Sequence, residues 1–178
     1  MIDQALIRAF AASAEFEKSG AIVNQALRSG KQTAFLCHSR KDATLARGLQ
    51  GFLQSKGWMV YIDWEGSAMQ PTPSPLTAQN TRERIKRLDW FVYLATAHSA
   101  ASRWCGWEMG YADAVKPADR ILIIPTYDSD SKPHGREFMD LYRHISVAAQ
   151  GGYGVFDPVT RRGPLLQRLK PGKPGPDG

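Results

Sequence analysis

One carboxylate among aromatic residues is the first place in this sequence where chemistry can be expected. Glu108 follows Trp104 by four residues in a predicted helix over residues 101–115, and Trp107 and Tyr111 recur at the same helical spacing. Glu108 also precedes Ala112 by four residues, so we expect it to lie on the apolar and aromatic face of that helix. A buried carboxylate costs free energy unless it is paired or has a function. Glu108 is a candidate catalytic residue, and the alternative is a structural carboxylate held by an arginine such as Arg40 or Arg103.

A second polar group follows the first apolar run of the chain. His38, Ser39 and Arg40 stand between a predicted strand at residues 33–37 and a predicted helix at residues 41–56. Ser39 is a typical helix cap. Arg40 and the free N–H groups of the helix start could also bind a phosphate. Both interpretations, a cap alone and an anion site, stay open from the pattern.

A third candidate pair opens a proline-rich loop. Asp63 and Trp64 follow a predicted strand at residues 58–62 and precede the loop at residues 66–75. Asp63 could hold ribose hydroxyls, and Trp64 could stack on a base. The alternative is a turn-forming aspartate beside a surface aromatic residue. Long loops that follow strands are frequent places for function.

Strands and helices alternate between these candidates. Beyond the two strands already named, short apolar runs predict strands at residues 90–95, 120–125 and 144–147. Helices are expected between them, at residues 41–56, 76–88, 101–115 and 136–142. This alternation predicts an α/β fold with a flavodoxin-like five-stranded parallel sheet and helices on both faces. In such a sheet ligands bind beyond the carboxyl ends of the strands, where all three candidate groups lie.

The two ends of the chain differ from its middle. Residues 1–30 predict a helical extension with Ile2, Leu6 and Phe10 on one face, residues 31–160 the main domain, and residues 161–178 a basic, Pro/Gly-rich, disordered tail. The net charge is +6, of which five bases and one acid after residue 160 contribute +4. Nucleic-acid binding is the weakest option, because such proteins carry a basic stripe on a folded face.

The remaining reactive residues predict no metal centre. The four histidines show no metal-ligand spacing, and two cysteines are too few for a four-cysteine zinc site. Cys105 is expected to be a small buried hydrophobe, and Ser99 and Ser102 are expected to be helix caps. No apolar run reaches bilayer length, and the N-terminus lacks a signal-peptide pattern, so the expectation is a cytoplasmic protein without a membrane partner.

Three segments together resemble the Toll/interleukin-1 receptor (TIR) domain, in particular its bacterial stand-alone, NAD-cleaving, Thoeris-like members. Residues 34–42 (AFLCHSRKD) look like the opening strand of the family, with Cys37 where serine is commoner. Residues 57–64 (GWMVYIDW) are similar to its second strand and BB loop. The S-x-W-C-x-x-E element at residues 102–108 is the most specific of the three. The proline-rich loop and the N-terminal extension depart from the family pattern.

The resemblance implies an activity. Many TIR domains cleave the bond between nicotinamide and ribose in NAD⁺ with the glutamate that Glu108 matches, which gives ADP-ribose or a cyclic isomer of it. It implies Glu108 as catalytic residue and substrate contacts from His38, Ser39, Arg40, Asp63, Trp64 and Trp104. NAD⁺ is then a substrate, and no cofactor is expected. Self-association through TIR–TIR contacts, a separate effector that senses the product and a role in anti-phage defence follow from the same resemblance.

Two other functions remain open. A catalytically silent adaptor would bind other TIR domains, although adaptors generally lack a glutamate placed like Glu108. An enzyme resembling nucleoside 2-deoxyribosyltransferases would share the fold layout and a catalytic glutamate, and would exchange bases between deoxynucleosides.

Overall fold

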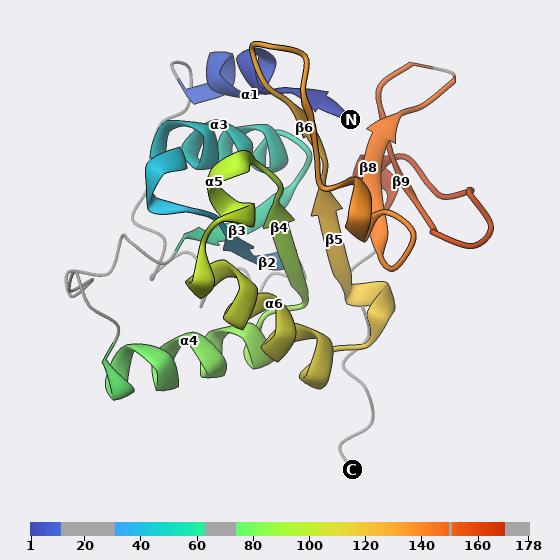
Figure 1. Cartoon of the computed structure of the whole chain (residues 1–178). Coiled ribbons are helices and arrows are strands. Elements are labelled where there is room, and N and C mark those ends of the chain that lie inside the picture. Colours follow the sequence, from blue (N-terminus) through green and yellow to red (C-terminus); the bar gives the residue numbers. More distant parts are fainter. Residues whose placement is uncertain (12–30, 63–73, 150, 170–178) are drawn as a thin grey trace.

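Six strands form the central sheet of the computed structural model, which describes residues 1–11, 31–62, 74–149 and 151–169 (Figure 1). Their order is β3–β2–β4–β5–β8–β9, and neighbours are parallel except for β8 and β9. The bounds are β2 (Gln32–Cys37), β3 (Trp58–Ile62), β4 (Trp90–Leu94), β5 (Ile121–Ile124), β8 (Arg143–Val147) and β9 (Tyr153–Phe156). The predicted flavodoxin-like order of five parallel strands is confirmed, and β9 is an additional antiparallel edge strand.

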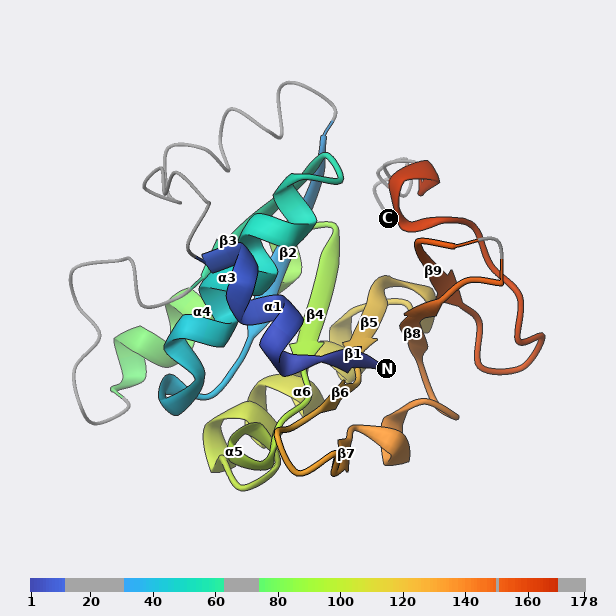
Figure 2. The same ribbon diagram turned by 90° about the horizontal axis from the view of Figure 1, so that it is seen from above.

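Helices cover both faces of this sheet, as predicted. Figures 1 and 2 show α1 (Gln4–Ala11) lying on α3 (Ala43–Gln54) on one face. The other face carries α4 (Pro75–Arg87) and α6 (Arg103–Val115), and the short α5 (Ala97–Ala100) follows β4. Single 3-10 turns are η1 (Arg40–Asp42), η3 (Ala118–Arg120), η4 (Arg136–Phe138) and η5 (Leu166–Arg168). The helix predicted at residues 136–142 is wrong, since only the turn η4 forms there.

Alternating side chains of the central strands fill two cores. Along β2 and β4, Leu36 and Val92 point toward α1 and α3, whereas Phe35 and Phe91 point toward α4 and α6. All four side chains are fully buried. Strands covered on both faces are apolar at every position, which is why their sequences read as continuous runs.

The α3 helix forms because its apolar residues share one face. Leu45, Leu49, Phe52 and Leu53 are buried in the first core, and the opposite side is exposed. The chain leaves this helix through Gly57, whose φ of 87° is a left-handed conformation that favours glycine. The sequence predicted both the helix and its end.

The first residues of the chain pack onto the main domain. Strand β1 (Ile2–Asp3) pairs in parallel with β6 (Thr126–Tyr127), which pairs with β7 (Pro133–His134) in a small second sheet. In α1 the buried apolar residue is Ile7, whereas Leu6 is 44% exposed. Of the predicted face, Ile2 and Phe10 pack on the first core, as expected, whereas the prediction for Leu6 is wrong because Ile2 stands in strand β1 and not in the helix.

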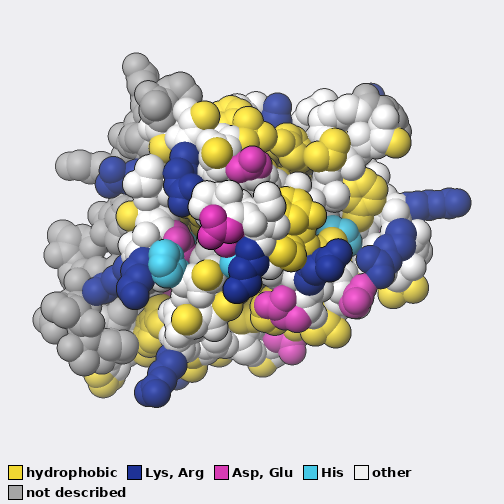
Figure 3. All heavy atoms as spheres, turned by 45° about the horizontal axis from the view of Figure 1, so that its top comes forward, with side chains coloured by type: hydrophobic (Ala, Val, Ile, Leu, Met, Phe, Trp, Pro, Cys, Tyr) yellow, Lys and Arg dark blue, Asp and Glu magenta, His cyan; other side chains and the backbone are white. Residues whose placement is uncertain are grey.

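Residues 161–169, expected within a disordered tail, lie against the sheet. Leu166 in η5 is 1% exposed within the first core, and Leu165 forms an isolated bridge with Gly154. The Gln32 side-chain amide donates to the carbonyl of Leu169. Figure 3 shows one face of the molecule, on which basic side chains are scattered among acidic ones. Each described helix is too short or too polar to cross a bilayer.

Candidate functional site

Local capping fixes the start of the helix that carries Glu108. Thr96 and Ser99 form a reciprocal capping box at α5, directly after β4. Ser102 then accepts a hydrogen bond from the backbone N–H of Cys105 at 3.2 Å and caps α6. Ser102 is thus a helix cap, as predicted, whereas Ser99 is the third helical residue in a capping box whose N-cap is Thr96. This double cap directs α6 back over the carboxyl ends of the strands.

Glu108 lies on the face of α6 that meets the sheet. It is 3% exposed, and the other buried residues of the helix are Cys105, Met109 and Ala112. Trp104, Trp107 and Tyr111 lie on the half-exposed flank instead. Of the predicted apolar and aromatic face, Ala112 is buried with Glu108, whereas the aromatic members lie on the adjoining flank. The expectation that the aromatic rings enclose Glu108 is therefore wrong. Positions i+3 and i+4 lie about 60° and 40° to either side of residue i, so both adjoining stripes fit one helical pattern.

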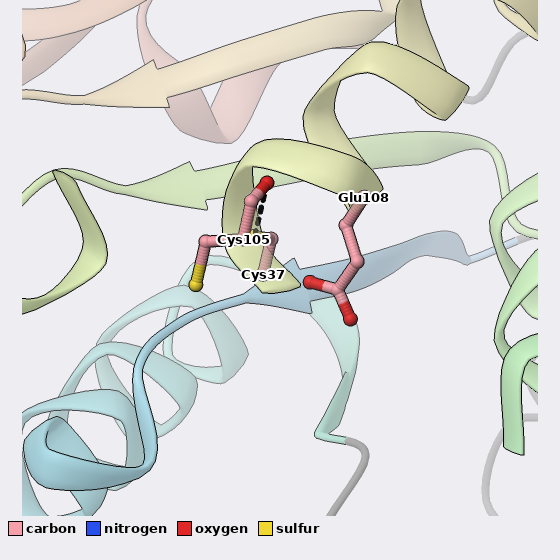
Figure 4. Close-up of side chains that lie close together, drawn as sticks. All are labelled: Cys37, Cys105 and Glu108. Atoms are coloured by element: carbon pink, nitrogen blue, oxygen red, sulfur yellow. Dashed lines mark hydrogen bonds between the residues drawn. The ribbon is translucent and has the colours of Figure 1, made fainter. Parts of the chain in front are cut away.

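Two thiols lie beside the Glu108 carboxylate. Cys37 ends β2 and points toward α6, and Cys105 stands one turn before Glu108; Figure 4 shows Glu108 and Cys105 reaching from α6 toward the end of β2. The two sulfur atoms and a carboxylate oxygen lie within 4.8 Å of one another. The Cys37 thiol faces the carbonyl of Cys105 at 3.9 Å. Sequence reasoning missed this contact, since it depends on how α6 is placed over β2.

Burial controls the ionisation of Cys37. Desolvation raises the pKa of this thiol well above its ordinary value of 9.0, and the hydrogen bond to Cys105 and the charge of Glu108 raise it further. Cys37 is therefore a neutral thiol near pH 7. It can donate to an acceptor, and it does not compete with Glu108 for a cationic partner.

The aromatic flank of α6 forms a stacked row. Trp104 and Trp107 stack with their centroids 4.6 Å apart, and Tyr111 continues the row at 6.1 Å from Trp107. The guanidinium of Arg82 on α4 lies 5.2 Å from the Trp107 centroid. The indole N–H of Trp104 is buried without a hydrogen-bond partner among the described residues. Trp104 thus offers a ring face and a donor beside the helix turn that carries Glu108.

The three residues after β2 occupy different environments. His38 is 9% exposed, and its Nδ1 lies 3.0 Å from the carbonyl of Leu36. Burial lowers the pKa of His38 below its ordinary value of 6.5. The hydrogen bond with the Leu36 carbonyl and the charge of Asp42 act in the opposite direction and do not cancel this effect. Ser39 accepts from the N–H of Lys41 at 3.4 Å and caps η1. Arg40 is exposed on that turn. No phosphate contact of these residues has been tested, so the anion site stays a prediction.

Asp42 is a structural residue that the sequence reasoning did not single out. It is 7% exposed and accepts from the Thr96 hydroxyl at 2.6 Å. Its other oxygen lies 2.8 Å from Nδ1 of His98. These bonds join the exits of β2 and β4 at the edge where Glu108 lies. Its place three residues after Ser39, at the start of a helix, was the available signal.

Asp63 and Trp64 lie outside the described residues, so their predicted roles remain predictions. The strand that precedes them does end level with β2, because Ile62 pairs with Leu36. On the other side of β2, Cys37 pairs with Tyr93. Burial raises the pKa of Tyr93 to about 12, so this side chain is a neutral phenol at the floor of the site. Ligand binding was predicted at the edge formed by the carboxyl ends of the strands. The residues at this edge are His38, Cys37, Tyr93 and Glu108.

Comparisons with known proteins agree with this architecture. A family model described as a TIR domain matches residues 34–151. A protein of Bacillus cereus (strain MSX-D12), named "Probable 3' cyclic ADP-D-ribose synthase ThsB'", is 31% identical over 114 residues. The match covers 63% of this chain and 59% of the length of that relative. The matched segment contains the strands and helices that carry the candidate site.

Proposed function

The chain belongs to the TIR domain family, and from this premise we propose that it cleaves NAD⁺ between nicotinamide and ribose. The observation that carries the proposal is Glu108, a carboxylate buried at the carboxyl edge of a parallel sheet, where ligands of such folds bind. It stands in the S-x-W-C-x-x-E element that resembles the catalytic segment of the family. The name of the Bacillus relative supports the same substrate.

The proposed reaction breaks one bond and develops one charge. The bond between nicotinamide nitrogen and ribose C1′ breaks, and its electron pair leaves with neutral nicotinamide. The ribose becomes an oxocarbenium-like cation. The negative carboxylate of Glu108 stabilises this cation and holds the ribose hydroxyls. Because surrounding side chains exclude water from Glu108, its attraction for the cation is stronger than it would be in bulk solvent.

Other predicted contacts position the substrate in this proposal. Arg40 and the N–H groups near Ser39 bind the pyrophosphate, with His38 beside them. Asp63 and Trp64 hold the ribose and base from the loop. Trp104 supplies a wall of the pocket with its ring face and its buried N–H. These roles come from the family resemblance, and substitution of each residue can test its role.

The product depends on what captures the cation. Water gives ADP-ribose and a proton. Capture by the adenosine half of the same molecule gives a cyclic ADP-ribose isomer, and exclusion of water favours it. The name of the relative supports the cyclic product for this chain. We propose that this product is a signal for a separate effector in anti-phage defence, and that self-association activates the enzyme.

Replacing Glu108 by glutamine tests the proposal. The change keeps the size of the side chain and removes its charge. We expect nicotinamide release from NAD⁺ to fall about 100- to 1,000-fold, the cost of losing an electrostatic group at a developing charge. Liquid chromatography with mass spectrometry measures nicotinamide and identifies the second product as linear or cyclic.

The matched control is Glu83→Gln on the exposed side of α4, which should retain the wild-type rate. Equal nicotinamide release by wild type and Glu108→Gln would show that the mechanism is wrong. Absence of NAD⁺ consumption by concentrated wild type, with retained binding to other TIR domains, would favour the adaptor. Base exchange between deoxynucleosides would favour the transferase.

A further inference from the structure

The cluster of Cys37, Cys105 and Glu108 has the composition of a metal site. Two sulfurs and one carboxylate oxygen converge from β2 and α6, all within 4.8 Å of one another. Thiolates select soft or borderline cations such as Zn²⁺ over Mg²⁺ and Ca²⁺. We propose that these three residues bind a thiophilic divalent cation, with Zn²⁺ as the type case. The sequence predicted no metal, because the ligands come from segments almost 70 residues apart.

The distances fit such a site after small movements. Ligand atoms in a tetrahedral zinc site lie about 3.5–3.8 Å apart, given bond lengths near 2.0–2.3 Å. From separations of up to 4.8 Å, the ligand atoms must therefore approach one another by about 1.3 Å at most, which rotation of three side chains can supply. Three protein ligands leave the fourth position open to water, the arrangement of zinc sites that exchange ligands.

The surroundings favour ligand binding by all three groups. Cys37, Cys105 and Glu108 are between 0 and 3% exposed, so water competes weakly for a bound ion. Binding replaces two S–H protons, which pass to the solvent, by two sulfur–metal bonds. Two thiolates and one carboxylate bound to a 2+ ion carry a net charge of −1.

Metal binding would make the Glu108 carboxylate unavailable for the proposed reaction. An ion coordinated by Glu108 neutralises the charge of the carboxylate, which then no longer stabilises the ribose cation. The ion also occupies the space in which the ribose would bind. Zn²⁺ is therefore expected to inhibit NAD⁺ cleavage, and to do so in competition with NAD⁺. This part of the inference depends on the proposed function, whereas the binding of the metal does not.

Cobalt binding tests the site without any enzyme assay. The full chain, reduced with a phosphine and freed of metal with a chelator, is titrated with Co²⁺. We expect the near-ultraviolet charge-transfer band of cobalt thiolates, abolished on adding Zn²⁺. Cys37→Ser and Cys105→Ser should each halve the band and weaken Co²⁺ binding about tenfold or more, and Glu108→Gln should weaken binding while keeping the band.

The control is His134→Gln, which removes another possible ligand pair, His134 with Asp128 at 2.9 Å. It should leave the cobalt spectrum and affinity unchanged. Thermal unfolding confirms that each cysteine variant is folded before it is titrated. A wild type without the charge-transfer band overturns the proposal, as does a cysteine variant that is folded and binds Co²⁺ as tightly as wild type.

Inhibition separates the two proposals. Zn²⁺ should raise the apparent KM for NAD⁺ in wild type, and Cys37→Ser should resist it about tenfold or more. If the wild-type chain binds cobalt through both cysteines and never consumes NAD⁺, the metal site is supported and the proposed function is contradicted. If the wild-type chain cleaves NAD⁺ and shows no cobalt band, the proposed function is supported and the metal site is contradicted.

Discussion

At the scale of the residue, the central feature is a carboxylate enclosed with two thiols. Glu108 and Cys105 come from one turn of α6, and Cys37 comes from the last residue of β2. The neutral thiol of Cys37 can donate to oxygen without adding charge, so Glu108 remains the group that a cationic ribose would meet. The same three residues become metal ligands once both thiols lose their protons. One cluster thus has two mutually exclusive chemistries.

His38 carries a pH dependence of stability at the same edge. Burial lowers its pKa below 6.5, so the unfolded chain binds a proton at a higher pH than the folded chain does. Its contribution to the free energy of unfolding is complete above pH 6.5 and is lost as the pH falls through the lowered pKa. We expect urea unfolding to show this decline as the pH falls below 6.5, and His38→Gln to flatten it.

A parallel decline in wild type and His38→Gln would show that His38 does not carry this effect. His144 provides an independent comparison, because burial also lowers its pKa. His144→Gln should flatten part of the same window, and the double variant should flatten more than either single variant does.

At the scale of the element, the strands and the amphipathic α3 could be predicted, whereas the faces of α6 could not. Short apolar runs at residues 33–37 and 90–95 predicted buried strands, and the structure places both in the centre of a sheet covered on its two faces. In α6 the row of aromatic residues adjoins the row that contains Glu108, and only packing on β2 decides which of the two is buried. The pair β1–β6 escaped prediction because it joins segments more than 120 residues apart. Strand β9 pairs with the neighbouring β8, but its short sequence with Gly154 carries no clear strand pattern.

The contact between α1 and α3 depends on Gly48. A Cβ atom at this position would stand 2.0 Å from the backbone carbonyl oxygen of Ile7, so the two helices would have to separate. Gly48→Ala should lower the free energy of unfolding by about 1–3 kcal/mol, despite the better helix propensity of alanine. Urea denaturation monitored by circular dichroism measures the change.

Gly110 on α6 is the matched comparison, because a Cβ atom there meets nothing within 4 Å. Gly110→Ala should raise stability by about 0.5–1 kcal/mol. If both variants change stability in the same direction, the close approach of α1 to α3 is not what requires glycine at position 48.

At the scale of the whole molecule, segments from both ends of the chain complete the first core. Ile7 from α1 and Leu166 from η5 are each 1% exposed there. The composition of residues 161–178 predicted disorder, because its many Pro, Gly and basic residues concealed the single leucine that is buried. A segment of such composition can still pack when one apolar side chain finds a place in an existing core.

Leu166→Ala measures how much the packing of residues 161–169 on the first core contributes to the free energy of unfolding. Removing a fully buried leucine side chain costs about 2–5 kcal/mol, so the variant should unfold at a clearly lower urea concentration. Leu141→Ala is the control, because Leu141 is 60% exposed and its loss should change stability by less than about 0.5 kcal/mol. Equal midpoints for Leu166→Ala and wild type would place residues 161–169 outside the cooperative unit.

The two hydrogen bonds of Asp42 have a mechanical consequence. A buried charged acceptor contributes about 1.5–3 kcal/mol through each such bond, so the exits of β2 and β4 resist separation. On the other side of α6, the guanidinium of Arg82 on α4 lies over the rings of Trp107 and Tyr111. The sheet edge beside Glu108 is thus held together through Asp42, and the side facing α4 adds a contact between a cation and aromatic rings.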